Sequence, residues 1–329
     1  MRNPKNAVKR VGWAAVGALP ASTQRRVRKI LGERQPRRVE LASLDAELSR
    51  VSALFATSED RARDCLAYLE LQIPADQPAD PFSSEYRDWT WRLYREISGR
   101  SDKYSTANED SPFDLQRAIV RPFPFETGSA RVVGDDLAAR GHLLRCLGDD
   151  ALGLAPPARI VEFGPGWGNL TNDLVATGFH VTAVEISEQF CTLIRERCPI
   201  PANLTLVRND MLAFAASEPY DAAVFFESFH HCSDHLALLR NLHQVVRPGG
   251  VVFFASEPVT DMPYPWGPRL DGLSLWSTRT YGWLELGFDD AYFEAALART
   301  GWKAERRILG RVPGIADVII ASAIPGWNG

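Results

Sequence analysis

The sequence predicts an α/β fold in which a mainly parallel, Rossmann-like sheet is preceded by a helical amino-terminal region. Residues 158–325 alternate short apolar or β-branched runs with segments of helical periodicity, a pattern typical of βαβ units. A glycine-rich turn follows the first of these runs. Residues 39–134 instead place many apolar residues at helical spacing. These observations favour one sheet-based domain with a helical region attached to it.

Length and composition allow a large buried core. The chain has 329 residues, of which 45% are hydrophobic, enough for one large domain or two ordinary ones. Residues 1–38 hold eleven Lys or Arg and one acid, whereas the other 291 residues hold 26 Lys or Arg and 40 Asp or Glu. A basic arm of charge +10 thus precedes a body of charge −14. We expect no nucleic-acid partner, because tracking phosphates would need a basic body surface.

The basic arm, residues 1–38, has two interpretations. It is either a solvated tail or a short cationic helix that makes weak peripheral contact with the anionic inner face of a membrane. Residues 11–22 look like a short signal peptide, but the basic stretch that follows them would hinder export. The five cysteines are odd in number and form no CxxC pair, which fits a reducing compartment. We therefore expect a cytoplasmic protein.

The region 39–134 is predicted to be helical and to help form the pocket of a substrate. Leu41, Leu44, Leu48, Val51 and Phe55 recur every three or four residues. This spacing predicts a helix packed on its own domain, since two heptads are too few for a coiled coil. Residues 88–97 predict another helix.

Prolines and glycines in residues 121–136 predict an irregular loop, followed by a helix over 137–147. After these residues, six strands are predicted, over 158–163, 180–186, 204–210, 221–226, 251–256 and 317–323. Right-handed crossovers between parallel strands place the functional loops at the carboxyl ends of these strands.

The strongest motif is VEFGPGWGNLT, residues 161–171, between the first predicted strand and the next helix. Gly164 permits a tight turn, Gly166 allows close backbone approach to a ligand, and Gly168 opens a helix whose amino end favours an anionic group. A dinucleotide site would need its third glycine at position 169, which is Asn169. The turn by itself is compatible with more than one nucleotide cofactor.

The motif resembles motif I of class I S-adenosylmethionine (SAM) dependent methyltransferases, and the resemblance extends over residues 120–325. It implies a seven-stranded sheet with an antiparallel last strand, a methyltransferase domain over 135–329, and SAM as the cofactor. In this resemblance Glu162 faces the methionine end, Glu185 accepts the ribose hydroxyls and Asp210 accepts the adenine amino group. The full set of implied cofactor residues is Glu162, Phe163, Gly164, Pro165, Gly166, Trp167, Gly168, Glu185, Ile186, Asp210, Met211 and Glu227.

A methyl acceptor that is a hydroxyl must lose a proton, so a base is expected at the carboxyl ends of the fourth and fifth strands. His230 and His231 follow the fourth strand, and Glu257 follows the fifth. Histidine titrates near neutral pH, and a carboxylate can orient its ring. The arrangement is similar to that of sugar O-methyltransferases of natural-product pathways. We predict that His230 or His231 takes the proton and that Glu257 orients the base.

Asp234 and His235 follow closely, but their spacing matches no established ligand pattern, so no metal is expected. They are instead assigned to the first turn of a helix capped by Ser233. Upstream, Glu126, Thr127 and Ser129 are candidates for contacts with the methionine moiety, although a structural linker would look the same.

Residues 258–287 form an insertion rich in aromatic residues. We expect it to act as a lid that holds the acceptor, because aromatic faces together with Arg and Asp suit a polar, ring-shaped ligand. The predicted acceptor contacts are Tyr264, Trp266, Arg269, Asp271 and Trp276. The alternative is that these aromatics are buried and tie the insertion to the amino-terminal region.

These features together predict O-methylation of a hydroxyl of a sugar or glycoconjugate. Two alternatives remain open at this level. One is methylation of a non-sugar secondary metabolite, at oxygen or nitrogen; the other is a non-catalytic SAM-binding scaffold. The oligomeric state cannot be predicted from these features.

Overall fold

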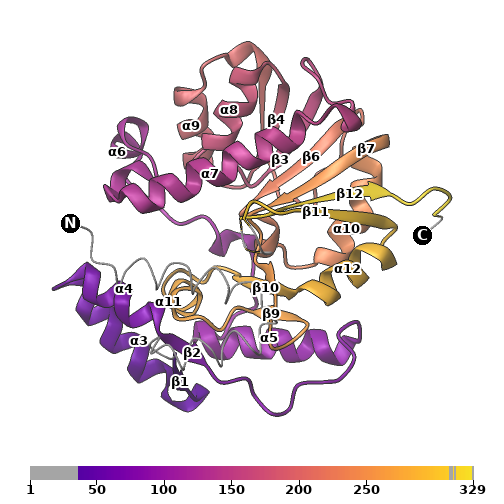
Figure 1. Ribbon diagram of the computed structural model, residues 1–329. Coiled ribbons are helices and arrows are strands. Elements are labelled where there is room, and N and C mark those ends of the chain that lie inside the picture. Colours follow the sequence, from indigo (N-terminus) through magenta and orange to yellow (C-terminus); the bar gives the residue numbers. More distant parts are fainter. Residues whose placement is uncertain (1–35, 311–313, 315, 328–329) are drawn as a thin grey trace, which may run out of the picture. The chain divides into compact units, whose positions relative to one another are not determined.

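The computed structural model describes residues 36–310, 314 and 316–327, so most of the basic arm lies outside the described residues (Figure 1). The chain forms two compact units. The first comprises the described residues up to Ser101 together with Pro268–Thr280 and Gly310. The second comprises Asp102–Gly267, Tyr281–Leu309 and the described residues from Gly314 onward. Part of the aromatic insertion therefore folds with the amino-terminal helices.

The first unit is mainly helical. Its helices are α3 (Leu41–Phe55), α4 (Glu59–Ala67), α5 (Ser84–Ser98) and most of α11 (Gly272–Tyr281). Strand β1 (Arg37–Val39) pairs in parallel with β2 (Leu69–Leu71). The helix predicted from the heptad spacing is α3, and its side chains Leu44, Leu48 and Val51 are buried. The helix predicted over 88–97 lies within α5.

The second unit contains the predicted seven-stranded sheet, in the order β11-β12-β7-β6-β3-β4-β5. Its strands are β3 (Arg159–Phe163), β4 (His180–Glu185), β5 (Leu204–Arg208), β6 (Tyr220–Phe226), β7 (Val246–Ala255), β11 (Trp302–Arg307) and β12 (Val318–Ala323). Only β12, the last, is antiparallel to both of its neighbours. The fold class is confirmed. Strand β11 was not located from the sequence, because its residues WKAERR are mostly polar or charged.

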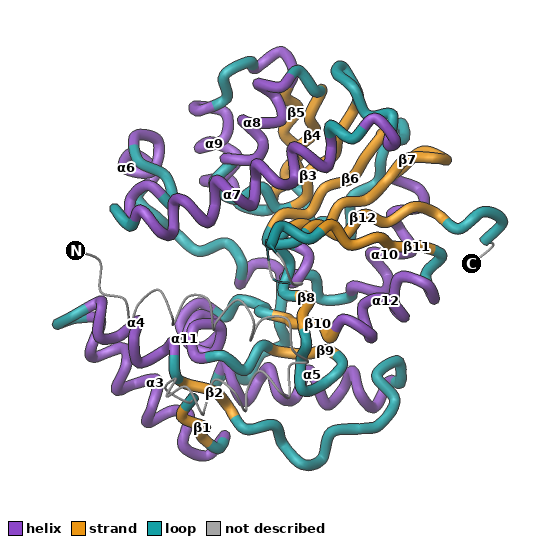
Figure 2. Tube along the Cα trace, in the orientation of Figure 1, coloured by secondary structure: helices purple, strands orange, loops and turns teal. Residues whose placement is uncertain are grey.

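Helices lie beside this sheet. They are α6 (Leu115–Val120), α7 (Ala130–Leu147), α8 (Asn169–Thr177), α9 (Glu188–Arg197), α10 (His235–Val245) and α12 (Asp290–Arg299). In Figure 2, α8 and α9 lie near β4 and β5, and α12 lies near β11. A smaller sheet, in the order β8-β10-β9, is formed by β8 (Val259–Thr260), β10 (Leu286–Asp289) and β9 (Trp266–Pro268). Within the described residues, no helix has the length and apolar character needed to span a membrane.

One expectation about residues 121–147 needs correction. The irregular loop ends earlier than predicted, because α7 begins at Ala130, where the Ser129 hydroxyl caps the helix by accepting from the Val132 N–H. The boundary expected at 134/135 therefore falls inside α7, and the compact units divide after Ser101. Helix α6 packs on α9, which places this segment in the second unit.

Candidate active site

The glycine turn between β3 and α8 leaves open space at one position only. Gly164, Gly166 and Gly168 all have positive φ, at 63°, 49° and 71°. A Cβ at Gly164 would lie 2.8 Å from the Ser228 Cβ, and one at Gly168 would lie 2.6 Å from the Ile194 Cγ1. A Cβ at Gly166 would meet nothing within 4 Å. The outer two glycines therefore permit close packing, whereas Gly166 leaves room for a ligand against its backbone.

Glu185 ends β4 and is tied to this turn. One of its carboxylate oxygens accepts from the Gly166 N–H at 3.1 Å, and the other accepts from the Ser187 N–H at 2.9 Å. Burial raises the pKa of Glu185, and the backbone hydrogen bonds oppose that shift. The structure thus brings together the glycine turn and the Glu185 carboxylate, which the resemblance assigned to the same cofactor.

Glu162 is only 1% exposed and lies under the turn, on β3. The Thr171 hydroxyl of α8 donates to its Oε2 at 2.7 Å. Burial raises the pKa of Glu162 to about 7, against the opposing effect of that hydrogen bond. This acid therefore links β3 to α8 and is partly protonated at neutral pH.

The other predicted cofactor residues lie around the same edge of the sheet. The Asp210 carboxylate accepts from the Leu212 N–H at 2.8 Å, and the Met211 Cε lies 3.9 Å from the position of a Cβ on Gly164. Phe163 stacks on Phe225 at 5.0 Å, so its ring belongs to the core.

Glu227 and Ser256 directly follow β6 and β7 and have left-handed backbones, with φ of 51° and 55°. Such strain in residues other than glycine is concentrated at functional sites. The two strained residues lie at the ends of β6 and β7, where the sequence predicts the catalytic group.

An aromatic cluster covers the turn from the segment before β3. The Trp167 ring lies 5.1 Å from Phe113, 5.2 Å from Phe190 and 6.2 Å from Phe123. The Asn169 side chain donates to the Phe123 carbonyl at 2.8 Å. The Phe113 backbone N–H and carbonyl both pair with the Gln189 side-chain amide. Residues 113–123 are therefore fastened beside the glycine turn.

Glu257 is the centre of the predicted catalytic group and is 3% exposed. Its Oε1 accepts from the Ser228 and Phe229 N–H groups, both at 2.8 Å. Its Oε2 accepts from the His230 N–H at 3.2 Å and from the His230 Nδ1 at 2.8 Å. Burial would raise the pKa of Glu257, but His230 and the backbone N–H groups outweigh it and lower the pKa below its usual value.

This carboxylate fixes the orientation of His230. A carboxylate can only accept, so Nδ1 of the ring donates and Nε2 is left as the basic nitrogen. His230 lies in a single 3-10 turn, η5 (Phe229–His231), which the Glu257 carboxylate holds through three backbone N–H groups. The prediction that Glu257 and one histidine lie together is met by His230.

His231 has a different partner. Its Nδ1 lies 3.2 Å from the Glu109 Oε2, which is an ion-pair distance, but the two atoms do not meet the criteria for a hydrogen bond. The centroids of the His230 and His231 rings are 4.2 Å apart, and the ring planes are tilted by 38°. Burial would lower the pKa of His231, but Glu109, followed by Glu285 and Glu257, raises it to about 9. His231 is therefore an imidazolium at neutral pH.

Glu109 and Glu285 were not predicted as site residues. The Glu109 Oε1 accepts from the Tyr104 hydroxyl and the Leu284 N–H, both at 2.8 Å. The Glu285 Oε2 lies 3.9 Å from the His230 Nε2. No local pattern marks either acid, because each reaches the histidines from a distant loop.

The residues that follow the histidine pair are structural. Asp234, and not Ser233, caps α10, because its carboxylate accepts from the Ala237 N–H. His235 is buried, and its Nε2 lies 2.6 Å from the Tyr292 hydroxyl. Among the described residues, no group of three or more His, Cys, Asp or Glu is arranged to hold a metal ion.

The predicted acceptor residues are divided between the two units. Tyr264 and Trp266 belong to the second unit and are buried, with Trp266 stacked on Tyr292 at 6.2 Å. Arg269, Asp271 and Trp276 belong to the first unit.

Within the first unit, the Asp271 carboxylate pairs with Arg269 at 3.0 Å and accepts from the Ser274 N–H at the start of α11. The Trp276 indole N–H donates to the Ser52 hydroxyl, and its ring lies 4.7 Å from Phe55. These contacts fit the packing alternative for the insertion, and contact of these residues with an acceptor stays a prediction.

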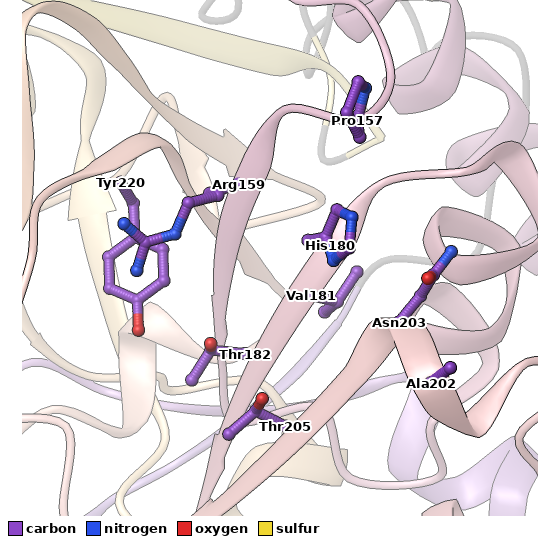
Figure 3. Close-up of a pocket in the computed structure, with 9 residues that line it drawn as sticks. All are labelled: Pro157, Arg159, His180, Val181, Thr182, Ala202, Asn203, Thr205 and Tyr220. Carbon is purple, nitrogen blue, oxygen red and sulfur yellow. The ribbon is translucent and has the colours of Figure 1, made fainter.

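A depression of about 400 Å³ lies at the opposite edge of the sheet, where the parallel strands begin (Figure 3). Arg159, His180, Asn203 and Tyr220 are among its lining residues, and the Arg159 guanidinium lies 5.0 Å from the centre of the Tyr220 ring. Ligands of open α/β sheets bind at the carboxyl ends of strands, so we do not place the active site here.

Comparison with known proteins agrees with this geometry. Residues 161–254, from β3 to β7, match the family model described as a methyltransferase domain. These residues are thus similar to a methyltransferase domain. An uncharacterized methyltransferase of Bacillus mycoides is 31% identical to the chain over 104 residues, which are 31% of this chain and 48% of that protein. The chain thus spans about half the length of the curated relatives it matches.

Solved methyltransferase structures align with part of the chain at low identity. The SAM-dependent methyltransferase from Mesorhizobium loti is 22% identical, covers 57% of this chain and 99% of its own, and gives a TM-score of 0.45. The N-methyltransferase NodS from Bradyrhizobium japonicum is 16% identical, with 57% and 94% coverage and a TM-score of 0.41.

Proposed function

We propose that this protein transfers a methyl group from SAM to a hydroxyl group of a small molecule, with His230 as general base. The observation that carries the proposal is the buried Glu257–His230 pair, with its 2.8 Å hydrogen bond, after the β6 and β7 strands. A hydroxyl is a weak nucleophile until its proton is removed, so an oriented histidine suits this acceptor.

The residues around the glycine turn suit SAM. We propose that the open backbone at Gly166, the Glu185 carboxylate and the Asp210 carboxylate hold the nucleoside end. Near the turn, the Glu126 Oε2 is buried without a hydrogen-bond partner, and an amino group such as that of the methionine moiety would satisfy it. When bound, SAM supplies a methyl group whose C–S bond breaks, its electron pair passing to sulfur, as an acceptor oxygen lone pair forms the new C–O bond.

The protein's contribution is orientation and proton removal. The Glu257 carboxylate holds the His230 Nδ1–H, which leaves Nε2 to accept the proton of the acceptor hydroxyl. The positive charge that forms on the ring is stabilised by the buried carboxylate beside it. Because four donors hold Glu257, the pair needs little reorganisation during the reaction.

Replacement of His230 tests this role. In His230→Ala and Glu257→Gln we expect kcat for a hydroxyl acceptor to fall by about 10²- to 10⁴-fold, because proton removal by a positioned base contributes that much. Turnover is measured as S-adenosylhomocysteine release from SAM, with an acceptor identified by labelling an extract of the source cells. Calorimetry checks that SAM affinity is kept. His180→Ala, an exposed histidine at the opposite edge, is the matched control.

The same experiment separates the alternatives. Turnover of an amine acceptor that is unchanged in His230→Ala would contradict the proposal and favour N-methylation, because a neutral amine needs no base. SAM binding without turnover of any acceptor would instead favour a SAM-binding scaffold.

Two further parts of the proposal rest on the sequence: the chemical class of the acceptor and the role of the basic arm, residues 1–38. We propose a sugar or glycoconjugate as the acceptor, supported by the aromatic residues, Arg and Asp of insertion 258–287. An acceptor panel of sugars against other metabolites tests it.

We propose that the arm, residues 1–38, holds the enzyme weakly at an anionic membrane surface in the cytoplasm. Its charge of +10 should give binding to vesicles rich in anionic lipid that is lost at high salt. Equal binding to neutral vesicles, or none to either kind, would contradict this role.

A further inference from the structure

We propose that His231 is a second catalytic residue, which donates a hydrogen bond to the acceptor oxygen while His230 removes its proton, and that Glu109 is the positioning residue that keeps His231 protonated. The inference rests on the proposed function and adds a division of labour between the two histidines. It is carried by the separate carboxylate partners of two adjacent rings.

Each histidine has its own acid. The Nδ1 of His230 lies 2.8 Å from Glu257, which follows β7, and the Nδ1 of His231 lies 3.2 Å from Glu109, in the segment before α6. The His230 Nδ1 is hydrogen-bonded to Glu257 and the His231 Nδ1 lies close to Glu109, so Nε2 is the nitrogen that each ring offers to a ligand. The ring centroids are 4.2 Å apart, close enough for both rings to reach one small polar group.

The charges around His231 favour its cationic form. Glu109, Glu285 and Glu257 face it from three different segments, and the neighbour on its own turn is His230. The Trp283 ring lies edge-on at 6.5 Å. These acids outweigh burial and raise the pKa of His231 to about 9. The ring therefore enters the reaction as a donor and cannot act as the base at neutral pH.

Glu109 is held in place before any substrate binds. Its Oε1 accepts from the Tyr104 hydroxyl and the Leu284 N–H, which leaves Oε2 towards His231. Two further hydrogen bonds join the same segments: Asn108 to the Gly282 carbonyl at 3.3 Å and the Trp283 indole to Ser111 at 3.0 Å. The loop that carries Glu109 is thus fastened to the loop that carries Glu285.

The chemistry balances without any other group. The acceptor proton passes to the His230 Nε2, and the oxygen lone pair forms the C–O bond as the C–S electron pair leaves on sulfur. His231 keeps its proton throughout. Its hydrogen bond and positive charge stabilise the negative charge that builds on the oxygen while the proton departs.

The test follows the titration of His231 directly. The chain has only six histidines, so NMR of the full-length protein labelled in histidine can resolve each ring. We expect His231 to titrate near pH 9 in the wild type and at least one pH unit lower in Glu109→Gln. Glu188→Gln, an exposed acid on α9, is the control and should leave the titration unchanged. A His231 that titrates near 6.5 in the wild type overturns the inference.

The pH profile of kcat/KM gives the second readout. The wild-type profile should fall on its basic side near pH 9, and Glu109→Gln should move that limb to lower pH, with at least about a threefold loss at pH 8.5 and SAM affinity unchanged. Glu109→Asp should restore part of the limb. A loss that is uniform over pH would show a merely structural role and overturn the inference.

The two proposals fail in different ways. Full turnover in His230→Ala overturns the proposed function, and this inference with it. A large loss in His230→Ala combined with an unmoved basic limb in Glu109→Gln overturns the role of His231 and Glu109 alone.

Discussion

At the residue scale, hydrogen bonding decides the charge of the buried acids. Glu162 and Glu257 are 1% and 3% exposed, yet their pKa values shift in opposite directions. Glu162 accepts one hydrogen bond, from the Thr171 hydroxyl, and burial outweighs it, so the pKa is raised. Glu257 has three backbone N–H donors and a histidine, and these prevail. The first acid ties β3 to α8, and the second holds the His230 ring through its Nδ1.

Glu162 should make the fold less stable at alkaline pH. Its folded pKa of about 7 is above the unfolded value, so the folded state holds the proton more tightly. That contribution to stability is complete below about pH 4.5 and is lost as pH rises through 7. Relative to the wild type, Glu162→Gln should therefore gain up to about 3 kcal/mol in its free energy of unfolding between pH 5 and 8.

Urea denaturation of both proteins across this pH range measures the difference. The glutamine side chain of Glu162→Gln can still accept the hydrogen bond from the Thr171 hydroxyl. Thr171→Val removes that bond and so measures its contribution separately. A difference between Glu162→Gln and the wild type that is constant with pH would show that Glu162 is ionised in the fold at all of these values.

At the element scale, the turn from β3 to α8 combines two kinds of glycine. Gly168 is needed by the packing of α8 against Ile194 on α9, and Gly166 leaves open space beside the Glu185 carboxylate. The two positions share a positive φ, so the backbone strain of an alanine is similar at both. They differ in what the added methyl group would meet.

Gly166→Ala and Gly168→Ala should therefore behave differently. Gly166→Ala should cost about 1 kcal/mol of stability from strain, yet lower SAM affinity at least tenfold, because its methyl group occupies the space for the ligand. Gly168→Ala should cost about 2–4 kcal/mol, since strain is joined by overpacking against Ile194.

Thermal unfolding and calorimetric titration with SAM separate the two effects. If Gly166→Ala bound SAM as tightly as the wild type, the open position at residue 166 would not be part of the cofactor site.

At the scale of the whole molecule, each compact unit is built from separate stretches of the chain. Residues 268–280 leave the second unit and complete the first unit, where the Leu71 N–H donates to the Leu270 carbonyl and α11 packs on residues near α4. A Cβ at Gly272 would lie 2.5 Å from the Leu66 carbonyl oxygen. Residues 268–280 of the insertion are thus a structural part of the first unit, whatever contact they make with an acceptor.

Gly272→Ala should destabilise the first unit by about 2 kcal/mol, because the methyl group would meet backbone that cannot move aside easily. Hydrogen exchange should become faster at amides of both α4 and α11 and stay unchanged in β7. Gly141→Ala, where a Cβ meets nothing within 4 Å, is the control. Faster exchange in α11 alone would contradict a shared folding unit.

Local patterns were sufficient for six of the seven strands of the main sheet, the glycine turn and helix α3, because strand alternation, glycine spacing and heptad spacing are short-range properties of the chain. They were not sufficient for β11, whose polar residues give no strand signal, or for the start of α7, which depends on a cap at Ser129. A resemblance located the histidines and Glu257, but could not say which histidine is the base. Only the tertiary structure brings Glu257 to His230 and Glu109 to His231, because these acids reach the two rings from distant parts of the chain, and the roles proposed for the two histidines rest on those contacts.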